Sequence, residues 1–427
     1  MVSSCEPVVT RKPIVHVIGA GLAGLAAAVS LAGGSRDVIV YEAARQAGGR
    51  CRSYFDTTLG MVIDNGNHLL LSGNADALDF LRIIGGLGAL SEAPEADVAF
   101  IDLASKERWR VRPNAGPLPW WIFAPDRRVP GARWSNYLAL LPLLAPGADR
   151  RIDAVIDCKG LLYERLWRPF LLAALNTEPR EGSAQLAGAI IRATFARGGA
   201  ACRPIVAHGL SAAFIEPAVA SLIKRGADVR LDHRLRKIAF SDGRASALDF
   251  GDAGVDLGPG DEVILATPAP VAQDLIPGLI APQSFRAIVN AHFKIAPPQG
   301  QPAILGVVNG TIEWIFTFPD RISITISGAD RLLDAGREEL AARLWAEVAS
   351  ALDLDRPLPP WRIIKEKRAT FAATPQENAR RPGARTAFSN LTLAGDWTAT
   401  GLPATIEGAV RSGYRAADLI RRKGRSP

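Results

Sequence analysis

The sequence predicts an α/β fold in which a parallel sheet forms one domain and an α+β region forms a second domain interleaved with it. Three observations support this prediction. Hydrophobic runs at 14–18 and 38–41 flank an alanine-rich apolar segment at 22–31, which is typical of a strand-helix-strand unit in a parallel sheet. Short alternating runs broken by glycine and aspartate span 226–268. Another buried-strand pattern stands near the far end, at 391–394.

Length and composition narrow the class of protein. The 427 residues are enough for two domains, and 48% of them are hydrophobic, which indicates a globular chain. The net charge of +7 comes from scattered arginines without a long basic run, so we predict no nucleic-acid partner. A basic soluble surface explains this charge best, and attraction to an anionic membrane or an acidic partner is also compatible with it.

Cysteine usage and the start of the chain indicate its compartment. The four cysteines, Cys5, Cys51, Cys158 and Cys202, form no CxxC pair, which argues against a disulfide framework and against a metal site. The first 13 residues lack the apolar core of a signal peptide, and no apolar run is long enough to span a bilayer. We therefore predict a cytoplasmic protein, at most peripheral to the inner membrane face.

A glycine pattern follows the first predicted strand. Gly19, Gly21 and Gly24 form G-x-G-x-x-G at the start of the alanine-rich helix. Such glycines permit a tight turn, close approach of a pyrophosphate to the backbone, and close packing of helix and strand. Glu42 ends the next strand, where a carboxylate accepts hydrogen bonds from a ribose. These residues predict a Rossmann-like dinucleotide site, without deciding between nicotinamide and flavin.

The segment after Glu42 narrows the choice of dinucleotide. Arg45, Gly48, Gly49 and Arg50 belong to R-x-x-G-G-R-x-x-S, which resembles the glycine-doublet flavoproteins that include amine oxidases and phytoene desaturases. This resemblance implies FAD as cofactor, with the doublet beside its pyrophosphate and ribityl chain.

The far end of the chain completes the resemblance. Gly395 and Asp396 follow the run at 391–394, as in those flavoproteins, where the aspartate contacts the ribityl and phosphate region. A helix beginning near Ala404 is expected to point its positive end at the flavin ring. The further cofactor contacts implied by this resemblance are Asn65, Gly66, Pro403, Ala404 and Thr405.

Other segments are similar to one branch of these flavoproteins, the squalene-associated FAD-dependent desaturases, or hydroxysqualene dehydroxylases. The resemblance extends from about residue 14 to 422, with Asn67 standing where glutamine is more usual. The segments that carry it are 64–71 (DNGNHLLL), 166–169 (LWRP), 173–177 (AALNT), 201–204 (ACRP), 209–214 (GLSAAF), 290–293 (NAHF) and 314–316 (WIF).

The resemblance implies a step of squalene and hopanoid biosynthesis, in which hydroxysqualene loses its hydroxyl group and gains a hydride from reduced flavin. An oxidative carotenoid- or phytoene-type desaturase is the alternative, because the same flavin motifs serve hydride transfer in either direction. A flavin-bound scaffold without catalytic activity is a third reading. No second dinucleotide fingerprint is present, so we expect an external electron donor.

The middle of the chain is expected to supply the substrate site, and its pattern predicts a helix at 159–176 and an alternating strand at 311–318. Five of the nine tryptophans fall between 86 and 204, and their rings either line an apolar tunnel or simply pack the domain. The leaving hydroxyl needs a proton donor, for which His292, His68 and Glu313 are candidates, each with a structural role as the alternative. We predict an FAD domain formed by 1–85, 205–275 and 365–427, and a substrate domain formed by 86–204 and 276–364.

Overall fold

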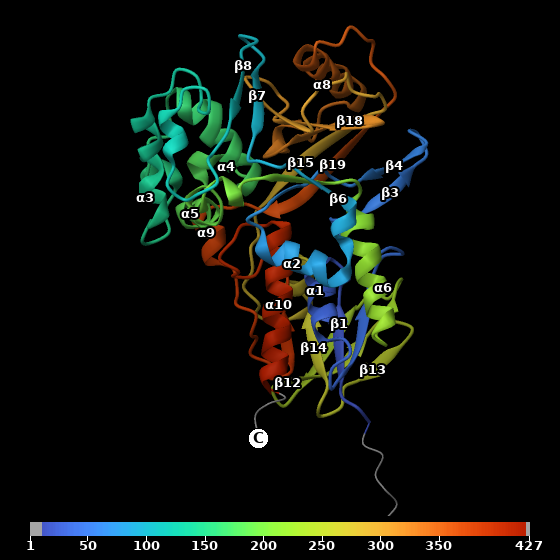
Figure 1. Cartoon of the computed structure of the whole chain (residues 1–427). Coiled ribbons are helices and arrows are strands. Elements are labelled where there is room, and N and C mark those ends of the chain that lie inside the picture. Colours follow the sequence, from blue (N-terminus) through green and yellow to red (C-terminus); the bar gives the residue numbers. More distant parts are fainter. Residues whose placement is uncertain (1–10, 424–427) are drawn as a thin grey trace, which may run out of the picture.

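The computed structural model of the chain describes residues 11–423 (Figure 1), so Cys5 lies outside the described residues. The lower half of the molecule in Figure 1 is built on a parallel five-stranded sheet with strand order β10-β2-β1-β14-β20. Its strands are β1 (Ile14–Ile18), β2 (Asp37–Tyr41), β10 (Asp228–Arg230), β14 (Glu262–Leu265) and β20 (Leu391–Leu393). The sheet therefore combines strands from both ends and the middle of the chain.

Both faces of this sheet are covered, which explains why its strands are hydrophobic runs. On one face, Val15 and Val17 share a core with helix α1 (Leu22–Leu31). On the other face, Ile18 and Tyr41 share a core with an antiparallel three-stranded sheet. That smaller sheet contains β11 (Lys237–Ser241), β12 (Arg244–Asp249) and β13 (Gly254–Asp256). The predicted block at 226–268 is thus divided between two sheets.

Three further helices lie on the α1 side. They are α2 (Ala75–Ile84), α6 (Glu216–Lys224) and the C-terminal helix α10 (Ile406–Lys423), and α10 packs along α1. A Cβ atom on Gly413 of α10 would lie 2.3 Å from the Ala23 carbonyl oxygen, so the two helix backbones are nearly in contact. None of the helices within residues 11–423 has the length and apolar character needed to cross a membrane.

The upper half in Figure 1 contains a seven-stranded sheet with order β19-β15-β18-β17-β16-β7-β8, antiparallel except where β16 meets β7. Helix α8 (Arg337–Leu352) packs on one face of it. The strands are β7 (Val98–Asp102), β8 (Arg108–Val111), β15 (Phe285–Phe293), β16 (Ile304–Val308), β17 (Trp314–Phe318), β18 (Arg321–Ile326) and β19 (Trp361–Phe371).

A helical region and small sheets complete the described chain. The helical region contains α3 (Leu141–Leu144), α4 (Arg168–Leu175) and α5 (Ala184–Ala193). Two short helices, α7 (Ala269–Leu275) and α9 (Pro375–Ala379), belong to other segments of the chain. Strands β3 (Ser53–Asp56) and β4 (Met61–Asp64) form a hairpin. Strands β5 (Leu69–Leu71), β9 (Pro204–Ala207) and β6 (Leu90–Glu92) form a small sheet that connects the two halves.

The expected domain limits need one adjustment. The limit between 364 and 365 falls inside β19, which pairs with β15 along its length as far as Phe371. The edge strand of the upper sheet therefore continues for seven residues into the segment that we had expected in the flavin domain. The assignment of each half to cofactor or substrate stays a prediction.

Candidate flavin site

The first glycine loop connects β1 to α1, and its three glycines have different surroundings. Gly19 has φ +108°, and its Cβ atom would lie 2.7 Å from the Ala266 carbonyl oxygen. A Cβ atom on Gly24 would lie 1.9 Å from the Gly19 carbonyl oxygen, so strand and helix touch there. A Cβ atom on Gly21 would meet no heavy atom within 4 Å. The space beside Gly21 therefore allows a ligand to approach the backbone.

Helix α1 begins directly after that space. No side chain caps its N-terminus, and its first turn carries no acidic residue. The free N–H groups of a helix N-terminus and its positive partial charge bind phosphate. This arrangement fits the pyrophosphate of a dinucleotide.

The glycine doublet lies against the first loop. The Gly48 amide donates to the Ala20 carbonyl oxygen at 2.8 Å, and a Cβ atom on Gly49 would lie 3.6 Å from the Gly21 Cα atom. Both doublet residues have positive φ, +114° and +58°, a region that favours glycine. The two motifs are thus brought together, as we expected of residues that share one ligand.

Glu42 and Arg45 differ in where their side chains lie. The Glu42 carboxylate accepts hydrogen bonds from the Ala20 amide at 2.8 Å and from the Ala44 amide at 2.9 Å, which holds it at the glycine loop. The Arg45 side chain is 92% exposed and pairs with Asp232 at 3.6 Å. The structure therefore brings Glu42 to the loop, whereas Arg45 faces solvent.

An ion pair connects the two ends of the chain. The Arg50 Nη2 atom lies 2.8 Å from the Asp396 Oδ1 atom, and Arg50 Nη1 donates to the Ala369 carbonyl oxygen. Attraction to the buried Asp396 carboxylate raises the pKa of Arg50. The Gly395 amide is held from α10 by the Ser412 hydroxyl at 2.8 Å. These contacts bring the glycine-doublet segment and the Gly395–Asp396 segment together, although Arg50 and Asp396 lie 346 residues apart in sequence.

The start of α10 is organised by its own residues. The Thr405 hydroxyl accepts a hydrogen bond from the Gly408 amide at 3.0 Å and so caps the helix. Pro403 and Ala404 lead into this cap in a short loop. The helix begins at Ile406, two residues later than the sequence predicts.

Arg381 is a residue that the sequence analysis missed. Its guanidinium is buried and donates to the carbonyl oxygens of Asp396, Trp397 and Thr398. Burial lowers the pKa of Arg381 to about 10. It therefore fixes the loop that carries Asp396. Only the dipeptide at 380–381 marks this arginine in sequence, and it matches no recognised motif.

The segment at 64–67 links the lower half to the upper sheet. The buried Asp64 carboxylate accepts from the Ser53 hydroxyl at 2.6 Å and from the Leu210 amide at 2.8 Å. The Asn67 amide group donates to the Ile324 carbonyl oxygen of β18 at 3.1 Å. Asn65 is buried, and a Cβ atom on Gly66 would lie 3.0 Å from the Asn290 amide nitrogen of β15. Asn65 and Gly66 thus lie where the two halves meet.

The candidate proton donor His292 is fully engaged. Its Nε2 atom lies 3.1 Å from the Asp64 carbonyl oxygen, which only accepts, so Nε2 carries the proton. Its Nδ1 atom then accepts from the Ser323 hydroxyl at 2.8 Å. Burial, with a contribution from Arg321, lowers the pKa of His292 to about 4. This neutral imidazole joins β15, β18 and the 64–67 segment, which is a structural role.

The other two candidates have different environments. His68 is half-buried, and burial together with the charge of Arg50 lowers its pKa to about 4, so it is neutral at pH 7. Glu313 is buried just before β17, where its Oε2 atom accepts from the Ser327 amide at 2.8 Å. Burial raises the pKa of Glu313 to about 7. Of the three candidates, only Glu313 titrates near neutrality.

The tryptophans of the middle region are divided between interior and surface. Trp109, Trp121 and Trp167 are buried, whereas Trp120 and Trp134 are about half exposed. The Phe100 ring stacks on Trp109 at 5.6 Å and meets Trp314 of β17 edge-on at 5.8 Å. Within the described residues, the indole N–H groups of Trp109, Trp167 and Trp314 are buried and have no hydrogen-bond partner. A buried donor without a partner is costly, which marks this cluster as unusual.

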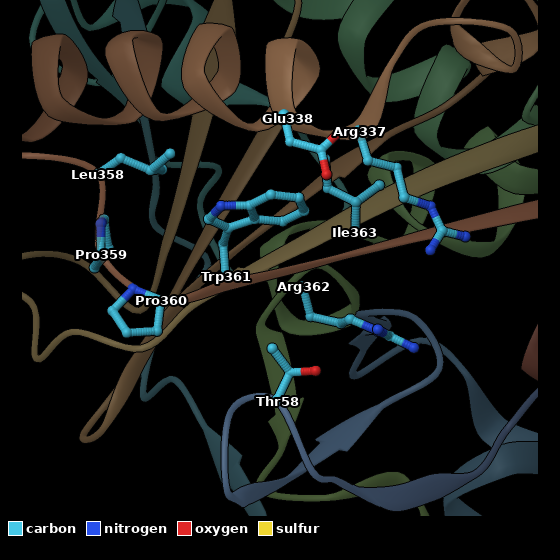
Figure 2. Close-up of a pocket in the computed structure, with 9 residues that line it drawn as sticks. All are labelled: Thr58, Arg337, Glu338, Leu358, Pro359, Pro360, Trp361, Arg362 and Ile363. Atoms are coloured by element: carbon cyan, nitrogen blue, oxygen red, sulfur yellow. The ribbon is translucent and has the colours of Figure 1, made fainter.

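A surface cavity of about 640 Å³ lies elsewhere, between the start of α8 and the β3–β4 turn (Figure 2). Trp361 lies in its middle, with Glu338 above it and Arg362 below it in the view of Figure 2. None of its lining residues belongs to the predicted flavin or proton-donor set. No group of three or more potential metal ligands occurs within residues 11–423.

Comparison with known proteins identifies the family. Residues 22–421 match the model of the flavin-containing amine oxidoreductases. The chain is 55% identical over 414 residues to a hydroxysqualene dehydroxylase from Rhodopseudomonas palustris, covering 96% of this chain and 99% of that protein. The chain belongs to the hydroxysqualene dehydroxylases, within the flavin-containing amine oxidoreductase family.

A second hydroxysqualene dehydroxylase, from Sinorhizobium fredii, is 55% identical over 406 residues, covering 95% of this chain and 97% of that protein. Among solved structures, cyclohexylamine oxidase from Brevibacterium oxydans shares the fold, with a TM-score of 0.68, 17% identity, and 97% and 100% of the two chains covered. A 15-cis-phytoene desaturase from an Oncidium hybrid is more distant, at 23% identity over 96% of this chain and 78% of that protein. Family membership makes the chain a flavin-dependent oxidoreductase and confirms the predicted fold class.

Proposed function

We propose that the chain reduces hydroxysqualene to squalene with FAD as cofactor, as a step of squalene and hopanoid biosynthesis. The observation that carries this proposal is its near-full-length similarity to relatives named for hydroxysqualene dehydroxylation. In the reaction, the carbon–oxygen bond of an allylic alcohol breaks, one proton leaves with the hydroxyl as water, and a hydride takes its place. Oxygen, hydrogen and charge balance if the flavin is reduced at the start and oxidised at the end.

The residues around the glycine loop fit FAD. The open space at Gly21, the uncapped start of α1 and the adjacent doublet would hold the pyrophosphate, with Glu42 at the adenosine ribose. Asp396, held by Arg50 and Arg381, would contact the ribityl region. Bound reduced FAD supplies the hydride. Pro403, Ala404 and Thr405 would present the start of α10 to the flavin ring.

The remaining chemistry falls to the substrate half. The buried aromatic cluster of Phe100, Trp109 and Trp314 would exclude water, which would otherwise recapture a carbocation. Glu313 is our choice as proton donor to the leaving hydroxyl. A buried carboxylic acid with a pKa of about 7 holds and releases a proton at neutral pH.

The domain organisation and the electron supply follow from this assignment. The segments around the five-stranded sheet would form the FAD domain, and the helical region with the seven-stranded sheet would form the substrate domain, with their limit moved to the end of β19. Because the sequence contains one dinucleotide fingerprint, reduction of the flavin would come from an external donor.

Anaerobic incubation of the purified protein with reduced FAD and hydroxysqualene tests the proposal. Squalene should accumulate with matching oxidation of the flavin, and a stopped-flow trace should show that hydroxysqualene accelerates this oxidation. Desaturation of phytoene without conversion of hydroxysqualene would establish the desaturase alternative instead. Tight FAD binding with flavin oxidation indifferent to hydroxysqualene would indicate a scaffold.

A further inference from the structure

The helical region exposes an unusual number of large apolar side chains. Of the sixteen exposed large hydrophobic side chains in the described residues, seven fall between 118 and 161. They include Phe123, which is 59% exposed, and Trp134, which is 48% exposed. These seven residues form what we call the 118–161 surface: Leu118, Trp120, Phe123, Trp134, Leu138, Leu141 and Leu161. Large exposed apolar groups gathered in one region mark an interaction site.

Side-chain contacts connect members of this surface. The rings of Phe123 and Trp134 lie 5.5 Å apart. The Leu161 Cδ1 atom would lie 3.4 Å from a Cβ atom on Gly131. Leu161 therefore contacts the loop that connects Phe123 to Trp134. Leu138 and Leu141 follow Trp134 and are exposed, whereas Tyr137 and Leu140 point inward. The segment therefore turns one side to the core and the other to the surroundings. Figure 1 places α3 at the outer edge of the helical region.

The charge around this surface is positive. Residues 112–161 contain six arginines and one lysine against four aspartates: Arg112, Arg127, Arg128, Arg133, Arg150, Arg151 and Lys159 against Asp126, Asp149, Asp153 and Asp157. Asp126 pairs with Arg112 at 3.3 Å. The Arg127 guanidinium lies over the exposed Trp120 ring at 5.0 Å. Exposed tryptophan, phenylalanine and leucine bordered by arginine match the interface of an anionic bilayer, where apolar groups enter the acyl boundary and cations meet the headgroups.

We propose that the 118–161 surface docks the protein on an anionic phospholipid bilayer. This occupant is favoured over a second copy or a protein partner because the surface combines apolar side chains with an excess of positive charge. A copy of the same surface would bring like charges together.

The same surface continues into the interior through aromatic rings. Trp121 is buried directly beside the exposed Trp120, and its ring meets Tyr137 edge-on at 5.0 Å. Tyr137 in turn meets Trp167 at 5.9 Å, and Trp167 meets Phe195 at 5.3 Å. If the proposed function holds, docking would bring an isoprenoid alcohol in the bilayer up to the apolar interior of the substrate half.

Vesicle flotation tests the docking surface without any substrate. The flavin-loaded protein is mixed with vesicles of phosphatidylcholine alone or of phosphatidylcholine and phosphatidylglycerol in about equal parts. Wild type should float with the anionic vesicles, and less so at high salt. The double variant Phe123→Ser/Trp134→Ser should bind them at least about tenfold more weakly, because it removes two apolar anchors.

A matched control uses Phe55 and Val62, an exposed cross-strand pair on the β3–β4 hairpin. The hairpin lies on the opposite side of the molecule from α3 in Figure 1. Phe55→Ser/Val62→Ser should bind vesicles like wild type. Equal loss in the control, or undiminished binding by Phe123→Ser/Trp134→Ser, would overturn the proposal. So would light scattering that shows a wild-type dimer which this double variant dissociates.

A charge variant keeps the test valid if the apolar variant does not fold. Arg133 is exposed at the start of the Trp134 turn, so Arg133→Glu should fold and weaken binding to anionic vesicles only. Unchanged binding would contradict docking on a bilayer. Because no substrate is present, the flotation result stands apart from the activity assay: vesicle binding without squalene formation would refute the proposed reaction and leave the docking surface in place.

Discussion

At the scale of single residues, His292 links burial to pH dependence. Folding lowers the pKa of His292 from 6.5 to about 4. Between these pH values the imidazole is protonated in the unfolded chain but neutral in the folded protein. The stability from the neutral imidazole is present above pH 6.5 and is lost as the pH falls toward 4. Between pH 7 and pH 5 this loss is about 2 kcal/mol.

His292→Gln retains polar atoms and removes the titration. Urea unfolding at several pH values should show that acidification to pH 5 costs wild type about 2 kcal/mol more than the variant. Parallel curves for the two proteins would mean that His292 is protonated as easily in the folded as in the unfolded chain, contrary to its hydrogen bonds with Asp64 and Ser323.

Burial raises the pKa of Glu313 to about 7, whereas it lowers the pKa of His292. A proton donor with this pKa makes the reaction rate depend on pH near neutrality, which a purely structural residue does not do. Glu313→Gln keeps the shape of the side chain and removes the exchangeable proton. Turnover of hydroxysqualene should fall about 100-fold, and the alkaline limb of the wild-type rate profile near pH 7 should disappear. FAD absorbance after gel filtration serves as the control for folding. Full activity in the variant would exclude Glu313 as the proton donor.

Gly21 allows a test of cofactor binding that leaves the fold intact. A side chain there would enter open space, so Gly21→Leu should fold and yet weaken FAD binding at least about tenfold, or about 1.4 kcal/mol, by blocking the pyrophosphate. Glu42→Ala should weaken FAD retention for loss of the ribose contact. Gly24→Ala is the contrasting variant, because its Cβ atom would overlap the Gly19 carbonyl and disturb folding itself. Unchanged flavin absorbance in Gly21→Leu would contradict the assignment.

At the scale of elements, the packing of α1 on α10 holds the two ends of the chain together. The Gly413 Cβ position lies 2.3 Å from a backbone oxygen of α1, which a side chain cannot displace without moving a helix. Gly413→Ala should therefore reduce the free energy of unfolding by about 1–3 kcal/mol. Gly383→Ala, at an exposed glycine with open space, should change it little. Urea unfolding of both variants distinguishes local overpacking from a general effect of losing glycine.

The elements also show what the sequence could and could not predict. The β1-α1-β2 unit was predicted within a residue, because its hydrophobic runs and glycines are local signals. The helix expected at 159–176 instead contains a wide turn at Tyr163–Trp167 before α4, where Pro169 provides no N–H group for a regular helical hydrogen bond. The predicted strand at 311–318 begins only at Trp314, because the amides of Thr311 and Ile312 donate to the Glu347 carboxylate of α8 instead of to a neighbouring strand.

The residues of the candidate site differ in how far their positions could be predicted, and their contacts with FAD stay a prediction. The glycine motifs and Asp396 are short patterns that a sequence displays directly. The role of Arg381 depends on three carbonyl groups of a loop brought to it by folding, and no local pattern encodes that. The engagement of His292 likewise depends on β18 and on the 64–67 segment. Contacts between distant segments decide these assignments.

At the scale of the whole molecule, the five-stranded sheet is assembled from segments that only the folded chain brings together. Its strands come from residues 14–41, 228–265 and 391–393. The Arg50–Asp396 ion pair joins the residue after the glycine doublet to the loop after β20. A ligand held by all these segments gains its affinity only in the folded state. Its binding therefore stabilises the entire fold, rather than one loop.

Removal of the cofactor should consequently lower the thermal midpoint of the whole protein. Returning FAD at about 100 times its dissociation constant should restore about 2.7 kcal/mol. The helical region and the seven-stranded sheet should follow the same shift, because β5, β9 and β6 join the two halves. Differential scanning fluorimetry with FAD, and with NAD⁺ as the matched dinucleotide, measures this. Equal stabilisation by NAD⁺ would contradict a flavin-specific site, since the doublet and Asp396 would then contribute nothing beyond the first glycine loop.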